Sequence, residues 1–467
     1  MALHSIKKGL SLPITGLPEQ SVEDAPVTAH VAVVAADFVG MKARMHVEVG
    51  ADVSRGQLLF EDRKAEGVRH TAPGAGTVVA IHRGARRALL SVVIELNARE
   101  RAGELADADY TTFESYTGKP AAELNGDQVR ELLVESGLWT GFRTRPYNRQ
   151  PATETSPKSI FITAMDTRPL AADPAVALAG LEEDFAAGAT AVSKLTDGKT
   201  FLCRAPGSNL GNGVNDVQVE EFSGRHPAGL AGTHIHTLDP VDRNKVVWHI
   251  GYAEVANIGA LLRTGQLDLP RVVSIGGPAM TRPRLLRTRV GASLQSLLEG
   301  ETKDGENRII AGSVLDGRAA YTRDSSAEHR SIHAYLGRYD LQVSGLAEGR
   351  EREFLGWLKP GMDRFSTLPT YLSALFGGSK KFDMTTSTGG SERAMVPIGM
   401  YERVFPLDIL PTFLLRAIAV DDVERAEALG VLELAEEDLA LCTVVCPGKY
   451  NYGPILRRNL EIIEKEG

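Results

Sequence analysis

Two stretches of sequence decide the fold: Met395-Val-Pro-Ile-Gly-Met-Tyr-Glu-Arg-Val-Phe-Pro406 and Glu436-Glu-Asp-Leu-Ala-Leu-Cys-Thr-Val-Val-Cys-Pro447. Each fits the spacing of cluster ligands in bacterial iron–sulfur proteins, Cys-x2-Cys-x2-Cys-x3-Cys-Pro. At the four ligand positions, the first stretch has Met395, Ile398, Tyr401 and Phe405. The second stretch has Glu436, Leu439, Cys442 and Cys446. Six of the eight positions therefore lack sulfur or carry only a thioether.

Such a cluster is normally held by four thiolates, and only Cys442 and Cys446 remain. Four residues apart, they would share one face of a helix and could bind a metal with help from a partner chain. The alternative is that both are buried replacements for apolar residues, and that apolar side chains fill the space of a lost cluster. We therefore predict a helical, degenerate ferredoxin-like domain without metal, in an architecture typical of electron-transfer proteins.

Length and composition indicate a conventional multidomain protein. The 467 residues suggest about three or four domains. The net charge of −8 and the mixed signs along the chain argue against a nucleic-acid partner. We expect no signal peptide and no transmembrane segment, since no apolar run approaches roughly 18 residues. Three cysteines cannot form a disulfide framework, which is typical of a reducing compartment.

Short strands separated by glycine and proline follow residue 41. They include Val47-Glu-Val-Gly50, Gly56-Gln-Leu-Leu-Phe60 and Gly76-Thr-Val-Val-Ala-Ile81. This pattern resembles the barrel-sandwich domain of biotinyl and lipoyl carriers, with Lys64 near the position of the modified lysine. One hypothesis is that Lys64 carries a swinging arm, and the other is that it is a solvated charge in a loop.

Strands then alternate with helices, with strands expected at 160–163, 200–203, 217–222 and 246–250 and a helix at 253–262. This alternation favours a mostly parallel, Rossmann-like sheet. Strands at 271–275 and 285–290, followed by a helix at 293–298, resemble a soluble-ligand-binding β-grasp (SLBB) domain. Beyond residue 345 the pattern is helical. The apolar segment 363–382 could be a core helix or an aromatic face for a membrane partner.

We therefore predict an α/β multidomain protein with five parts. They are an N-terminal arm packed on the Rossmann-like domain (1–40), a barrel-sandwich module (41–98), a Rossmann-like domain (99–266), an SLBB domain (267–340) and a C-terminal helical domain (341–467).

Four histidines raise the question of a metal site, since imidazole is a common ligand of transition metals. His234 and His236 would point the same way if they lay on a strand. Neither they nor His226 and His249 have a companion cysteine or a spacing that completes a tetrahedral set. We favour a structural or docking role for this group.

The order of these modules identifies the chain as a member of a family by resemblance. It is similar to the NqrA family of bacterial Na⁺-translocating NADH:quinone reductases, which is related to the Rnf complex C subunit and the flavin subunit of complex I. The likeness runs from Ile6-Lys-Lys-Gly-Leu-Ser-Leu-Pro-Ile14 through Gly56-Gln-Leu-Leu-Phe-Glu-Asp62 to Cys446-Pro-Gly-Lys-Tyr450. It implies a peripheral subunit on the cytoplasmic side of the inner membrane, in contact with membrane subunits. The complex would pass electrons from NADH through flavins and iron centres to ubiquinone, coupled to sodium export.

The flavoprotein relatives hold FMN at three places, and each is altered in this sequence. Their Gly-rich loop reads Gly137-Leu-Trp-Thr-Gly-Phe-Arg-Thr144, their acidic segment keeps only Asp166, and their Asn pair reads Trp248-His249. Leu138 and Trp139 would fill the space that glycines leave for a phosphate. The resemblance therefore implies neither FMN nor NADH on this chain, and no catalytic residue.

A quinone or quinone-like inhibitor could take the place of the flavin, with Trp139, Phe142 and Trp248 as apolar walls and Arg143 as the polar contact. Two other functions stay open. One is a stand-alone flavin-dependent dehydrogenase, and the other is a carrier modified on Lys64.

Overall fold

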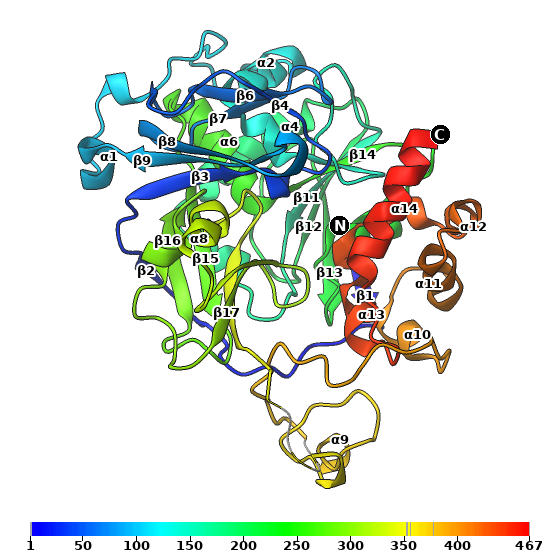
Figure 1. Cartoon of the computed structure of the whole chain (residues 1–467). Coiled ribbons are helices and arrows are strands. Elements are labelled where there is room, and N and C mark those ends of the chain that lie inside the picture. Colours follow the sequence, from blue (N-terminus) through cyan, green and yellow to red (C-terminus); the bar gives the residue numbers. More distant parts are fainter. Residues whose placement is uncertain (1, 352–353, 355, 377, 467) are drawn as a thin grey trace.

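The computed structural model describes residues 2–351, 354, 356–376 and 378–466. Four β-sheets and a C-terminal group of helices form the body of the molecule, and a lobe around α9 (Ser373–Phe376) projects from it (Figure 1). No helix in the described ranges is long and apolar enough to cross a lipid bilayer.

The central sheet has six strands in the order β1-β13-β12-β11-β14-β10. Their bounds are Leu3–Ile6, Gln218–Gly224, Lys199–Arg204, Ser159–Ala164, Val247–Gly251 and Arg143–Arg145. Four of the five pairings are parallel, and only β10 runs antiparallel, to β14. The prediction of a mostly parallel sheet is confirmed.

Helices cover both faces of this sheet. Ile160 and Ile162 of β11 pack in the cluster that contains α2, α4 and α6, whereas Phe161 packs in the cluster on the α5 side. These helices span Gly126–Ser136, Glu182–Ser193, Tyr252–Thr264 and Ala231–Leu238. Helices α4 and α6 approach closely because Gly188 and Gly259 lie where they touch. A Cβ on Gly259 would lie 1.7 Å from the carbonyl oxygen of Asp184.

The barrel-sandwich module consists of a four-stranded sheet, β3-β9-β8-β5, and a three-stranded sheet, β4-β6-β7. Its strands are His30–Val34, Ala43–Met45, Asp52–Val53, Leu58–Asp62, Arg69–Thr71, Gly76–Arg83 and Leu89–Leu96. Apolar side chains of both sheets form one core. Because β3 pairs with β9, the sheet includes a strand that the predicted boundary at residue 41 assigns to the arm.

The fourth sheet has the order β18-β17-β19-β15-β16-β2. Its strands are Glu19–Asp24, Pro270–Gly276, Arg284–Arg289, Asn307–Ala311, Arg318–Thr322 and Gln342–Ala347, with α7 (Leu294–Leu297) and α8 (Ala327–His333) beside them. The N-terminal segment joins two sheets, since β1 extends the central sheet and β2 pairs with β16. With β3 in the barrel-sandwich module, the predicted arm of residues 1–40 therefore contributes strands to three modules, whereas packing on the Rossmann-like domain was expected.

The C-terminal helices are α10 (Met400–Val404), α11 (Pro411–Ala419), α12 (Val423–Ala428), α13 (Ala440–Val445) and α14 (Tyr452–Glu466). They share one apolar core and lie beside the central sheet (Figure 1). The segment before them differs from the helical pattern expected beyond residue 345. It begins with β19, and in the described residues between β19 and α10 only a 3-10 turn (Gly356–Leu358) and α9 are helical.

Candidate functional site

A cavity of about 170 Å³ lies where three modules meet. The carboxyl ends of β11 and β14 and the first turn of α6 form one side. The loop between β17 and β18 and residues 339–342 form another side, and Glu437 comes from the helical domain. Helices α4 and α6, which follow these two strands, pack in one cluster on the same face of the sheet, and the loop between β17 and β18 together with Glu437 bounds the space beyond the strand ends.

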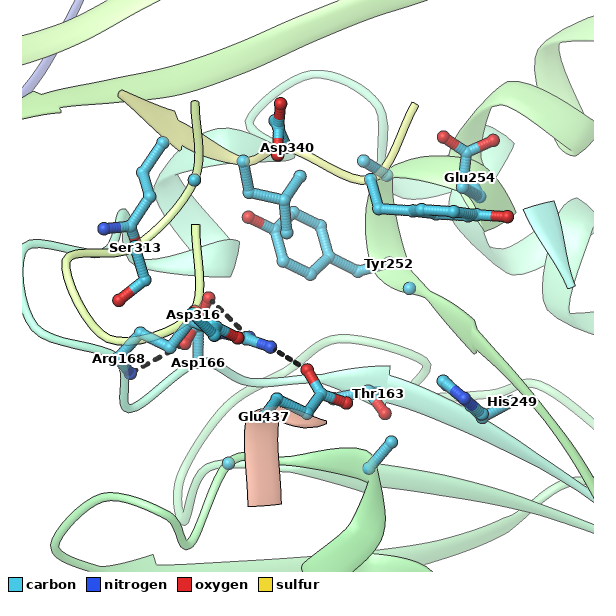
Figure 2. A pocket seen from close by; sticks show the side chains of 18 of the residues that line it. Thr163, Asp166, Arg168, His249, Tyr252, Glu254, Ser313, Asp316, Asp340 and Glu437 are labelled. Atoms are coloured by element: carbon cyan, nitrogen blue, oxygen red, sulfur yellow. Dashed lines mark hydrogen bonds and ion pairs between the residues drawn. The ribbon is translucent and has the colours of Figure 1, made fainter. Parts of the chain in front are cut away.

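Arg168 binds acidic groups from all three modules (Figure 2). Its guanidinium forms an ion pair with Glu437, and lies 3.4 Å from Asp316 and 3.5 Å from Asp166. Burial opposes ionisation of Glu437, but Arg168 and the nearby Arg143 and Arg145 outweigh it and hold its pKa at about 2. Burial raises the pKa of Asp166 and of Asp316. Arg168 therefore links the modules through at least one firmly ionised partner.

Arg145 forms a second layer behind this group. It is fully buried, and its guanidinium lies 3.2 Å from Glu437 and 3.5 Å from Asp438. It also lies 3.0 Å from Nε2 of His249. Burial, followed by the positive charge of Arg143, lowers the pKa of His249 well below its ordinary value. The imidazole is therefore neutral and accepts a hydrogen bond from Arg145.

The opposite side of the cavity carries Glu254, which pairs with Arg271 and with Arg338 at 2.5 Å. Two hydroxyls of residues that line the cavity, Oη of Tyr252 and Oγ1 of Thr163, have no hydrogen-bond partner among the described residues. Tyr252 is 2% exposed, and burial raises the pKa of its phenol. A buried hydroxyl without a partner costs free energy, so a ligand or water that bonds to either hydroxyl would be stabilised here.

The four predicted quinone contacts do not share one environment. Trp139, Phe142 and Trp248 are fully buried and pack on each other, with ring centroids 5.3 to 5.7 Å apart. Trp139 Nε1 donates to the carbonyl oxygen of Pro151 at 2.8 Å. Of the four, only Arg143 is among the residues that line the cavity. Its guanidinium lies 4.5 Å from the ring centroid of Tyr339. The aromatic residues form the core behind the cavity wall.

The eight cluster positions lie in or beside the core of the helical domain. Tyr401, Phe405, Leu439, Cys442 and Cys446 are buried, whereas Met395 is half-buried and Ile398 is 46% exposed. The eighth, Glu436, forms a two-contact ion pair with Arg457 at 2.6 and 2.8 Å. Among the described residues, no group of three or more His, Cys, Asp or Glu side chains is arranged to hold a metal ion.

A hydrogen-bonded group occupies the centre of this core. The Tyr401 hydroxyl lies 3.1 Å from Sγ of Cys446 and 2.9 Å from the Tyr452 hydroxyl, which is 3.5 Å from the same sulfur. Burial alone would raise the pKa of Cys446, but these hydrogen bonds lower it. Burial raises the pKa of the Cys442 thiol, so Cys442 stays protonated.

His234 and His236 do not lie on a strand, which is the arrangement in which they would point the same way. Both are on helix α5, where residues two apart point in different directions. His234 is fully buried and donates to the carbonyl of Ala228 at 3.0 Å. His236 binds Glu433 at 2.7 Å and accepts from the amide of Asp408 at 2.8 Å, which connects α5 to the helical domain.

His226 and His249 have other surroundings. Nδ1 of His226 lies 3.3 Å from the hydroxyl of Thr167, and burial lowers the pKa of this imidazole to about 3. His249 is bonded to Arg145, as described above. The four histidines therefore have separate partners.

Lys64 lies in the turn between β6 and β7 of the barrel-sandwich module, and its side chain is exposed. Its backbone amide donates to the carboxylate of Asp62 at 2.8 Å. The position suits both hypotheses for this lysine.

Sequence reasoning missed several residues of the cavity. Tyr252 directly follows β14, and Asp316 lies in a loop between Gly312 and Gly317. Polar residues directly after predicted parallel strands were an available signal. Glu437 carried no such signal, because only tertiary packing brings it to the strand ends.

Comparisons with known proteins agree with this architecture. Three family models match, described as the NqrA N-terminal barrel-sandwich hybrid domain (residues 4–97), the NqrA second alpha/beta domain (residues 124–267) and the NQRA C-terminal domain (residues 272–322). The predicted barrel-sandwich and SLBB modules are confirmed. A solved NAD⁺-reducing [NiFe]-hydrogenase matches 51% of this chain and 49% of its own, at 15% identity and a TM-score of 0.36.

Curated relatives match the chain from end to end. The NqrA subunit of the Na(+)-translocating NADH-quinone reductase of Saccharophagus degradans is 54% identical over 99% of both chains. The corresponding subunit of Marinomonas sp. is 52% identical over 100% of both chains, and that of Pasteurella multocida is 51% identical over 99% of this chain and 100% of its own. The chain therefore belongs to the NqrA family, one of the subunit families of the Na⁺-translocating NADH-quinone reductases, as its sequence resemblance predicted.

Proposed function

We propose that this chain is a peripheral subunit that shapes the reductase without carrying a redox group of its own. In this proposal it sits on the cytoplasmic side of the bacterial inner membrane and contacts the membrane subunits. NADH, flavins, iron centres and ubiquinone act elsewhere in the complex, which couples electron transfer to sodium export. The names of the relatives support the assignment to the complex.

The observation that carries the proposal is the packing around Cys446. An iron–sulfur cluster needs open space lined by thiolates. Here Tyr401 and Tyr452 fill the space next to this sulfur and bond to it, while Cys442 is held as a buried thiol. Building a cluster would require both phenol rings to leave the core, where each is at most 1% exposed.

The central sheet supports a similar argument about flavin. The strand order β13-β12-β11-β14 is that of a Rossmann-like sheet, which we propose as the ancestry of this domain. Leu138 and Trp139 follow α2, at the place of the Gly-rich loop of the flavoprotein relatives, and both are buried in the core. Their bulk occupies the volume that a phosphate would need near the backbone.

Purification of the full chain tests the proposal. We expect a colourless protein with flavin and iron far below one per chain, and we expect affinity capture from solubilised membranes to recover multi-span redox subunits. Stoichiometric FMN would instead support a stand-alone dehydrogenase. An intact mass raised by a lipoyl or biotinyl group, lost in Lys64→Arg, would support the carrier hypothesis.

A quinone remains a second candidate ligand, and the two unpartnered hydroxyls favour it. We propose that its carbonyl oxygens accept hydrogen bonds from Tyr252, Thr163 and Arg143, since no carboxylate of the described residues forms an ion pair with Arg143. Trp139, Phe142 and Trp248 would then support β10 and β14 from behind the wall.

Binding of a short-tail quinone to the full chain tests this site. Loss of a charged donor should weaken binding about tenfold or more in Arg143→Met, and Tyr252→Phe should weaken it less. Arg243→Met, far from the cavity and exposed, is the matched control. Equal affinity in all four proteins would remove the quinone site.

A further inference from the structure

The lobe that projects from the body in Figure 1 comprises the described residues of 354–382. Six large apolar side chains of this lobe are exposed to solvent. Phe354 is 90% exposed, Phe376 73%, Leu375 65% and Leu358 62%, and Met362 and Leu372 are each 41% exposed. Apolar side chains gathered on one projecting segment commonly mark a site of association.

The charge of the lobe is opposite to that of the whole chain. Its sequence holds four basic residues, Lys359, Arg364, Lys380 and Lys381, and one acidic residue, Asp363, in a chain with a net charge of −8. Lys380 and Lys381 lie close in sequence to Leu375 and Phe376. Basic residues beside exposed aromatic and aliphatic residues are typical of surfaces that bind anionic lipid.

The lobe is held together and fixed to the body. Lys380 Nζ donates to the carbonyl of Met362 at 2.8 Å, and the amide of Leu372 donates to the carbonyl of Pro360 at 2.9 Å, so its two halves are joined. At its base, Phe382 is 7% exposed and accepts a backbone hydrogen bond from Thr15 at 3.1 Å. The apolar side chains are therefore presented on a tied loop.

We propose that this lobe inserts its apolar side chains into the headgroup region of a bilayer and that its basic side chains bind anionic headgroups. Lysine is depleted in the cores of protein–protein interfaces, so its place beside these apolar residues favours lipid over a protein partner. Lysine and arginine can bury their stems and keep their charge at the lipid phosphates. The inference rests on the proposed placement at the membrane surface and adds a direct lipid contact.

Co-sedimentation of the full chain with vesicles tests the proposal. The probes are phosphatidylcholine vesicles with and without about 30 mol% phosphatidylglycerol. We expect binding to the anionic vesicles that weakens with salt. Leu375→Ser/Phe376→Ser should lower the partition coefficient at least about tenfold. Lys381→Glu, which leaves the contact between Lys380 and Met362 in place, should lower binding to anionic vesicles and leave binding to neutral vesicles unchanged.

The matched control is Leu410→Ser/Phe413→Ser, which removes the same two residue types from α11 and the residue before it, where they are 60% and 48% exposed. It should bind vesicles like the unchanged chain, and melting temperatures should show that all variants fold. Absence of vesicle binding, or equal loss in the control, overturns the inference. If the chain still captures membrane subunits without binding vesicles, the proposed function stands and only the lipid contact fails. If capture then depends on Leu375 and Phe376, the lobe binds a protein.

Discussion

The cavity at the strand ends and the core of the helical domain both bury polar groups, but they differ in whether the hydroxyls have hydrogen-bond partners. In the cavity, Arg168 and Arg145 connect acidic residues of three modules, and the hydroxyls of Tyr252 and Thr163 remain without partners among the described residues. In the helical core, the polar atoms of Tyr401, Cys446 and Tyr452 bond to one another.

This difference indicates which site could still bind something. A closed group of hydrogen bonds within a packed core offers no free donor to a ligand. A cavity with ion pairs on its walls and unpartnered hydroxyls offers donors at fixed positions. We infer that the cavity at the strand ends suits a small ligand better than the helical core does, and that the group around Cys446 serves stability.

The largest expected effect on stability comes from removing a cation from the charged groups beside the cavity. In Arg145→Met, Glu437 and Asp438 lose a fully buried cation, and a buried carboxylate left without its partner costs about 3–5 kcal/mol. We expect urea titration to show a lower free energy of unfolding by that amount. Arg243→Met removes an arginine that is 48% exposed from its pair with Glu427, and should cost less than about 1 kcal/mol. Equal losses in the two variants would mean that Arg145 is not a structural link.

Local pattern explains what could be predicted. Apolar periodicity identified β11, β14 and α6 to within two residues, because buried strands and amphipathic helices carry their own signal. Helix α5 was missed, since its short run of alternating histidines also fits a strand. The segment after β19 was expected to be helical, but its glycines and prolines keep most of its described part irregular.

The cavity could be predicted only in part. Arg143 was identified, and Asp166 was noted as the last acidic residue of its segment. The neighbouring Phe142 and Trp139 were placed in the same site, although they face the core, because sequence adjacency does not determine which side of a turn faces a cavity. Asp316 and Glu437 come from segments about 150 and 270 residues away from Arg168, so only packing of the modules brings them together.

A smaller effect is expected on the pH dependence of the free energy of unfolding, through the buried acid Asp438. Burial raises the pKa of Asp438 from an ordinary 3.8 to about 6, although the positive charge of Arg145 opposes this rise. The folded state therefore holds this proton more tightly than the unfolded state does. The protonated carboxyl adds to the free energy of unfolding below pH 4, and this addition is lost as the pH rises through 6. We expect Asp438→Asn to reduce the fall in unfolding free energy between pH 4 and 7 by on the order of 2 kcal/mol. Asp24→Asn, whose carboxylate is 81% exposed, should leave the pH profile unchanged, and an unchanged profile in Asp438→Asn would contradict the assignment.

The smallest expected effect on stability concerns the hydrogen bonds in the core of the helical domain. Tyr401→Phe removes the hydroxyl that bonds to Cys446 and Tyr452, and should lower the free energy of unfolding by about 1 kcal/mol. It should also make Cys446 react more slowly with a thiol reagent, because the hydrogen bond from Tyr401 lowers the pKa of this thiol and its loss leaves less thiolate. Tyr450→Phe is the control, because the Tyr450 ring stacks on Tyr452 while its hydroxyl has no hydrogen-bond partner in the described ranges. If Tyr401→Phe is neutral and instead allows iron to bind during reconstitution, then the hydroxyl blocks a metal site that the fold has kept, and the helical core would join the cavity as a place where this subunit can bind a ligand.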